Sequence, residues 1–177
     1  MKIEVPTSWN DVTVEEYQQI ASLDTDETPR KRLANIVSIL CNINAYDLGS
    51  EPLHEIQEAL SFMNEDISKD RFSSITVDGV EYEWIKSINE ITLGEEISIE
   101  QTIEQEQLNY AQSFDLVMSV LLQPKGEVFN AKKIKERREL FSTFPIDKVY
   151  GMILFFLNGG QTSLKDTPQY LVVQKKK

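Results

Sequence analysis

The chain has 177 residues, 41% of them hydrophobic and 9% aromatic, with a net charge of −11. This composition is typical of a globular protein with a sizeable core and excludes a disordered chain. The longest apolar stretch, at 149–157, is far shorter than the roughly 20 residues needed to cross a membrane. The first residues lack a signal-peptide pattern and Cys41 is the only cysteine, so we expect one domain over 1–177 in a reducing compartment.

The first third of the chain predicts three helices. Thr13 and Glu16 have the spacing of a capping box, so a short helix should follow them. Pro29 after Thr28 opens a second helix, and Pro52 opens a third. The second helix has one apolar stripe at helical spacing, made of Leu33, Ile36, Val37, Leu40 and Cys41.

A β-hairpin is predicted at 75–85. Apolar and polar residues alternate on both sides of Asp78 and Gly79, and this pair favours a tight turn with positive φ at both positions. We expect the hairpin to be an insertion at one edge of an otherwise helical domain.

Two helices are predicted after the hairpin. Thr92 and Glu95 have the spacing of a second capping box, which should start an acidic helix that ends near Ile103. A long helix over 105–122 should follow and end before Pro124. Its apolar surface is broad, so we expect this helix to lie at the centre of the fold.

The last part of the chain, the basic region 131–177, begins with a basic helix predicted at 131–141. An almost wholly apolar helix from Pro145 to about Leu157 and a short strand at 170–173 should follow. The predicted fold class is therefore mainly α with one β-hairpin (α+β), a single-domain bundle of six to eight helices.

Charge is divided unevenly along the chain. Residues 1–110 carry 23 acidic and 7 basic side chains, whereas residues 111–177 carry 6 acidic and 11 basic ones. Neither Lys nor Arg occurs between Lys86 and Lys125. The acidic helix should present three carboxylates at one-turn spacing, namely Glu96, Glu100 and Glu104. The basic helix contains five cationic residues, namely Lys132, Lys133, Lys135, Arg137 and Arg138.

The sequence predicts no catalytic, cofactor or metal site, and we expect a protein that is not an enzyme. His54 is the only histidine and should be exposed, Cys41 should be buried, and no glycine-rich phosphate loop is present. Nucleic-acid binding by the basic helix is disfavoured, because the whole chain is acidic and no aromatic residue is interleaved for base stacking. A membrane-surface role is also disfavoured, because the basic helix lacks a bulky apolar face.

Five short strings occur in a familiar order: Ser-Trp-Asn-Asp-Val-Thr-Val-Glu-Glu-Tyr at 8–17, Leu-Ser-Phe-Met at 60–63, Val-Asp-Gly-Val-Glu-Tyr at 77–82, Ile-Thr-Leu-Gly-Glu at 91–95 and Leu-Leu-Gln-Pro at 121–124. In this order and spacing they resemble a group of small tailed-bacteriophage proteins that are encoded among structural genes. The resemblance covers most of the chain from Trp9 to about Leu157. It implies a non-enzymatic virion component, or a tail or head-tail assembly factor, located in the virion or in the host cytoplasm during assembly. It assigns no functional residues.

Three interpretations of the charge division follow. In the first, the five basic residues meet Glu96, Glu100 and Glu104 of the next copy in a head-to-tail oligomer, or meet another phage structural protein. Apolar anchors for this contact are expected among Met152, Leu154 and Phe155. In the second, the acidic stretch 87–124 belongs to an adaptor or to a DNA-mimic inhibitor of a host nucleic-acid enzyme. In the third, the charges only solvate the surface.

Overall fold

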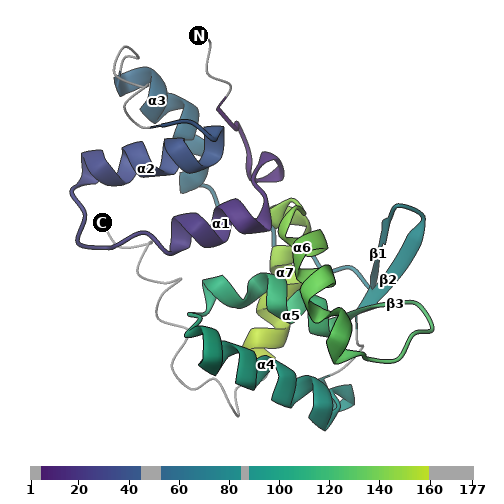
Figure 1. The fold of residues 1–177 in the computed structure, drawn as a ribbon. Coiled ribbons are helices and arrows are strands. Elements are labelled where there is room, and N and C mark those ends of the chain that lie inside the picture. Colours follow the sequence, from purple (N-terminus) through teal and green to yellow (C-terminus); the bar gives the residue numbers. More distant parts are fainter. Residues whose placement is uncertain (1–4, 45–52, 85–87, 160–177) are drawn as a thin grey trace.

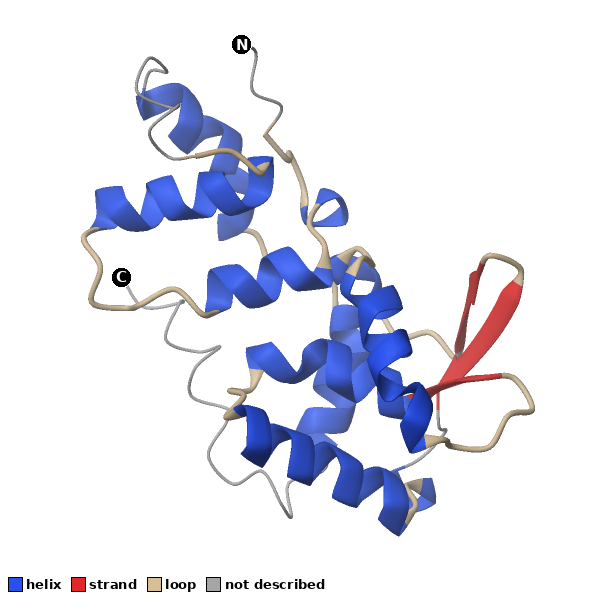
Figure 2. Cartoon of the chain, in the orientation of Figure 1, coloured by secondary structure: helices blue, strands red, loops and turns tan. Residues whose placement is uncertain are grey.

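The computed structural model describes residues 5–44, 53–84 and 88–159. They form seven α-helices, several short 3-10 turns and one three-stranded antiparallel sheet (Figure 2). The prediction of a mainly helical fold with a small β element is therefore confirmed. The predicted strand at 170–173 lies outside the described residues.

Three helices occupy the upper left of Figure 1: α1 (Val14–Ala21), α2 (Pro29–Cys41) and α3 (Leu53–Ala59), which continues as a 3-10 turn (Leu60–Asn64). The Glu16 backbone N–H donates to the Thr13 hydroxyl over 3.2 Å, and the Thr13 backbone N–H donates to the Glu16 carboxylate over 2.8 Å. This pair is the predicted capping box.

The predicted stripe of α2 is only partly covered. Val37 and Leu40 are buried, while Leu33, Ile36 and Cys41 are half-buried. The helix ends where Asn42 adopts the left-handed conformation, at φ 49°. Helix α2 therefore lies against the rest of the protein along a narrower band than its apolar residues would allow.

The predicted hairpin forms from β1 (Ser74–Val77) and β2 (Val80–Trp84), with Asp78 and Gly79 both at positive φ in the turn. A third strand, β3 (Leu122–Pro124), pairs with β2 and was not predicted. It is only three residues long and places Leu122 opposite Trp84. No alternation can be recognised in three residues, so this strand depends on the partner that the fold supplies.

The prediction of one long helix over 105–122 is wrong. Helix α4 (Leu93–Glu106) extends through the first two of these residues and ends at Gln107, which is left-handed at φ 53°. The chain then turns, passes through a 3-10 turn (Ala111–Ser113) and begins α5 (Phe114–Leu121).

A local hydrogen-bond pair accounts for this break. The Asn109 backbone N–H donates to the Gln112 side chain over 2.9 Å, and the Gln112 backbone N–H donates to the Asn109 side chain over 3.0 Å. This exchange has the geometry of a capping box and starts a new turn of helix. The Asn-x-x-Gln spacing was present in the sequence and is the signal that would have predicted the break.

Helix α5 lies at the centre of the fold, as the apolar pattern predicted. All eight of its residues are buried, including Asp115 and Ser119. Helices α6 (Ile134–Ser142) and α7 (Ile146–Gly159) pack beside it, in agreement with the predicted basic and apolar helices. The buried apolar side chains of the described residues belong to one core cluster.

Two backbone contacts hold α7 close to distant parts of the chain. The Ile146 N–H donates to the Val12 carbonyl, and the Val14 N–H donates to the Phe144 carbonyl, both over 2.8 Å. Further along α7, a Cβ atom on Gly151 would lie 2.3 Å from the Asp70 carbonyl oxygen. Only glycine permits this close approach of helix and loop.

Candidate interaction surface

Arg137 is buried inside the protein, although the sequence placed it with the surface cations. Its side chain is 4% exposed and donates to the Gln123 side-chain oxygen. A second nitrogen of the guanidinium donates to the Glu127 carboxylate over 3.1 Å. Because Gln123 belongs to β3, Arg137 joins α6 to the sheet and is not available to a partner.

Arg138 is also engaged within the chain. Its Nε donates to Asp115 over 2.7 Å, and its Nη1 donates to both carboxylate oxygens of Glu106 at 2.9 and 3.0 Å. Burial lowers the pKa of Arg138, but the hydrogen bonds that it donates to Asp115 and Glu106, together with the negative charge of these carboxylates, outweigh this effect and raise the pKa. The guanidinium therefore joins the end of α4, the start of α5 and the middle of α6.

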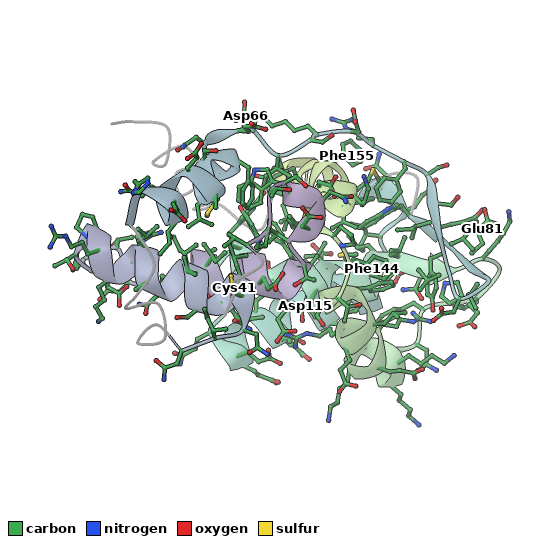
Figure 3. All side chains as sticks on the ribbon, turned by 90° about the horizontal axis from the view of Figure 1, so that it is seen from above. Cys41, Asp66, Glu81, Asp115, Phe144 and Phe155 are labelled. Atoms are coloured by element: carbon green, nitrogen blue, oxygen red, sulfur yellow. The ribbon has the colours of Figure 1, made fainter. Side chains whose placement is uncertain are left out.

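Asp115 is the centre of this network. It is buried, accepts a hydrogen bond from Gln18 over 2.8 Å and pairs with Arg138 on its other oxygen. Figure 3 shows Asp115 near the middle of the molecule, whereas Glu81 lies on the sheet at its far right. Gln18 belongs to α1, so the network also holds the N-terminal helices to the core.

The remaining cations of the basic segment lie on the surface. Lys133 is half-buried and pairs with Glu127 at 3.4 Å. Lys132 and Lys135 are exposed, and neither side chain has a hydrogen bond or an ion pair among the described residues. Of the five predicted cations, the structure thus leaves two fully available to another molecule.

The acidic face of α4 is available as a whole. Glu96, Glu100 and Glu104 are exposed, follow one another at one-turn spacing and pair with no cation in the described part of the chain. Glu95, in contrast, is 4% exposed and accepts from the Thr92 backbone N–H over 2.7 Å in the second predicted capping box. Adjacent glutamates on one helix therefore have different surroundings.

Two large apolar side chains are also exposed on this helix. The large hydrophobic residues exposed in the described ranges are Val80, Leu93, Ile97 and Val128, at 43%, 71%, 39% and 86%. Leu93 and Ile97 lie on α4 one turn apart, and Val128 lies in the loop before α6. The sequence did not predict these exposed side chains, because the apolar anchors were expected among Met152, Leu154 and Phe155 of α7. In the structure Met152 is buried, and Leu154 and Phe155 are half-buried.

The loop and the first turn of α4 are in contact. The Phe129 ring lies 3.8 Å from the position that a Cβ of Gly94 would occupy, so Val128 and Leu93 each lie next to a residue of this contact. Val80 lines a pocket of about 320 Å³ together with Glu127, which lies in the same loop, and Lys133, which follows the loop. The loop 125–130 therefore contacts the first turn of α4, where Leu93 is exposed, and shares a pocket with Val80 of β2.

The groups that carry catalytic chemistry are dispersed. His54 is exposed on α3, as predicted. Cys41 is half-buried rather than buried, and burial raises the pKa of its thiol. In the ranges 5–44, 53–84 and 88–159, no three His, Cys, Asp or Glu side chains gather as a metal site would require. No helix within these ranges is long and apolar enough to span a bilayer.

Comparisons with protein-family models, with curated proteins and with solved structures found no match.

Proposed function

We propose that the protein works through protein–protein contacts, without catalysis, as a structural component or an assembly factor of a tailed-phage particle. The phage context comes from the strings at 8–17, 60–63, 77–82, 91–95 and 121–124 and their resemblance to small phage structural proteins. Its partners are copies of itself, other phage structural proteins, or both. Its place is the virion, or the host cytoplasm during assembly.

One observation carries this proposal. Leu93 and Ile97 are exposed on α4, the helix that also exposes Glu96, Glu100 and Glu104, and these carboxylates pair with no cation among the described residues. Val128 is exposed in the loop before α6. Exposed apolar groups rimmed by charge are typical of surfaces that bind other proteins. Such charges steer association and fix its register, while the apolar groups supply most of the affinity.

Mass spectrometry of purified particles tests the proposal. We expect the protein either in mature particles at a stoichiometric ratio, or bound to a tail or head-tail precursor in infected cells and absent from the mature particle. The first result identifies a structural component, and the second identifies an assembly factor. A protein found only as a free molecule throughout infection, in cells that assemble particles normally after its deletion, would contradict the proposal.

A second candidate is an acidic adaptor or DNA-mimic inhibitor of a host nucleic-acid enzyme. The observation that favours it is the row Glu96, Glu100 and Glu104, which is exposed and free of cations within the described residues. A mimic of this kind should bind a DNA-binding enzyme and be displaced by duplex DNA, and Glu100→Lys should abolish the binding. Retention of the enzyme complex by the Glu96→Lys, Glu100→Lys, Glu104→Lys triple variant would exclude the row as the DNA-like surface.

A further inference from the structure

We infer that segment 170–177 docks on the exposed face of α4 in the same molecule and covers it. The segment has the sequence Tyr-Leu-Val-Val-Gln-Lys-Lys-Lys and lies outside the described residues. The inference rests on the proposed function in one respect, the use of this face to bind partners. It deepens that function by naming a segment of the chain that a partner must displace.

The exposed face of α4 combines apolar and acidic groups. Five exposed side chains lie within roughly 100° of arc around the helix axis, namely Leu93, Glu96, Ile97, Glu100 and Glu104. Among the helical residues whose burial is described, large exposed hydrophobic side chains occur on α4 alone. The three carboxylates have no ion pair in the described ranges. A segment that matches this face carries apolar side chains and positive charge together.

Segment 170–177 has this composition, and its groups follow one another in the same order. On α4 the apolar residues Leu93 and Ile97 come first, and the acidic row continues beyond them to Glu104. In the segment four apolar residues, 170–173, come before three lysines, 175–177. A segment that runs in the same direction as α4 therefore places apolar groups on apolar groups and lysines on carboxylates. Eight residues reach at most about 26–29 Å, enough to follow a helix of about 21 Å.

The C-terminal end of α4 favours the same direction. The last turn of this helix contains no basic residue. The helix dipole concentrates partial negative charge at this end, where a cation is stabilising. Glu104 adds a full negative charge there, whereas Glu106 is already paired with Arg138. The opposite direction would place the lysines beside Leu93 and leave the acidic end of α4 facing apolar side chains.

The chain between α7 and the segment is long enough for this contact. Helix α7 ends at Gly159, and ten residues, 160–169, separate it from Tyr170. Helices α4 and α7 both contact α5, so their axes lie about two helix spacings apart, roughly 16–20 Å. Ten residues span up to about 33–36 Å. In Figure 1, α4 lies along the lower edge of the molecule.

The covalent connection selects α4 of the same molecule over α4 of another copy. A tether of this length holds the segment at an effective concentration on the order of millimolar. A contact made by a few apolar side chains and exposed ion pairs is weak, because each exposed pair contributes little. It is therefore populated within one molecule at dilute concentrations, where two molecules rarely meet.

Disulfide formation in the full chain tests the docking. In a Cys41→Ser background, Gln101→Cys places a thiol one turn after Ile97, and Gln174→Cys places one between the apolar residues and the lysines of the segment. In dilute solution we expect an intramolecular disulfide that forms about tenfold or more faster than in the pair Ser61→Cys, Gln174→Cys. Ser61 is exposed and lies outside α4, so it is the matched control. Equal rates for the two pairs, or a ladder of chains linked to one another, would overturn the inference.

Charge reversal tests the proposed ion pairs. Lys175→Glu with Lys176→Glu should lower the ratio of the two disulfide rates by about tenfold, because attractive pairs become repulsive. The ratio corrects for the effect of the new charges on the thiol that both pairs share. Adding Glu100→Lys and Glu104→Lys should restore much of the ratio. Arg30→Glu with Lys69→Glu makes the same change in net charge at exposed sites outside α4 and should leave the ratio unchanged. A ratio that the lysine reversals do not lower would overturn the inference.

Release of the segment tests the link to function. Leu171→Asp with Val173→Asp should free the α4 face, lower the ratio of disulfide rates towards one and strengthen binding of the partner in infected cells. The two proposals fail separately. Equal disulfide rates in a protein that is present in particles would contradict the docking alone. A selective disulfide in a protein found only as a free molecule throughout infection would contradict the proposed function alone.

Discussion

Helix α4 and the segment 131–142, which contains α6, each carry a run of charged side chains but expose them differently. Helix α6 uses Arg137 and Arg138 inside the protein, where they pair with residues of β3, α5 and α4 and with Glu127 in the loop before α6. Helix α4 keeps Glu96, Glu100 and Glu104 on the surface and unpaired among the described residues. The comparison shows that a run of charged residues indicates a binding surface only if its side chains are not already paired with other residues of the same chain.

The physical reason is the difference between the arginine and lysine side chains. An arginine places a planar fork at the end of a long apolar stem, and it can satisfy several acceptors while the stem packs in the core. Lysine is more strongly hydrated and stays at the surface when no carboxylate is near. The basic segment of α6 divides in this way, because both arginines turn inward while Lys132 and Lys135 remain in solvent.

The largest expected effect comes from Arg137. Replacing it by alanine leaves the buried Gln123 oxygen without its donor, and we expect the free energy of unfolding to fall by about 2–3 kcal/mol. Lys135→Ala, two residues away on the same helix, should change it by less than about 0.5 kcal/mol. Urea denaturation followed by circular dichroism measures both. Equal effects of the two substitutions would mean that Arg137 does not join α6 to the sheet.

Asp115→Ala should have the second-largest effect. It removes an acceptor from both Gln18 and Arg138 in a buried site, so we expect a loss of about 2 kcal/mol in the free energy of unfolding. Glu104→Ala removes an exposed carboxylate that has no ion pair among the described residues and is the matched control, with an expected change within about 0.5 kcal/mol. A loss confined to Arg138→Ala, with Asp115→Ala close to wild type, would contradict the network described for Asp115.

Glu95 and Glu96 sharpen the comparison within α4 itself. Glu95→Ala removes one half of the second capping box and should lower the free energy of unfolding by about 1 kcal/mol. Glu96→Ala should leave it nearly unchanged but should weaken any contact that uses the acidic row. Thermal unfolding measures the first effect, and light scattering measures the second. If Glu96→Ala destabilised the chain as much as Glu95→Ala, the division between capping and surface glutamates would be wrong.

The smallest expected effect is a gain. Glu96, Glu100 and Glu104 are like charges one turn apart, and such pairs destabilise a helix by roughly 0.2–0.5 kcal/mol each. In a chain that also carries Leu171→Asp and Val173→Asp, Glu100→Gln relieves two of these pairs and should raise the free energy of unfolding by a few tenths of a kcal/mol at low salt. The gain should shrink as salt screens the repulsion. A loss of stability on this substitution would reveal a cation outside segment 170–177 that pairs with the acidic row.

Residues close together in the chain determined much of the local structure. Both capping boxes, the proline that opens α2 and the Asp-Gly hairpin turn rest on groups within four positions of one another, so the sequence specifies them directly. The apolar pattern also identified α5 and α7 as buried. The Asn109–Gln112 exchange belongs to the same class, and its signal was in the sequence.

Only the tertiary structure decided which charges remain on the surface. Arg138 meets Asp115 and Glu106, 23 and 32 positions away in the chain, and β3 forms because Gln123 and Leu122 come to lie beside Glu83 and Trp84. Such pairs depend on the path of the chain rather than on local spacing. The same is true of the contact between Phe129 and Gly94, which brings Val128 to the acidic helix. The sequence by itself determined the caps and the hairpin turn, because these depend only on residues that are close together in the chain, and its composition determined the number of charges of each sign. Packing determined which of those charges remain exposed to another molecule.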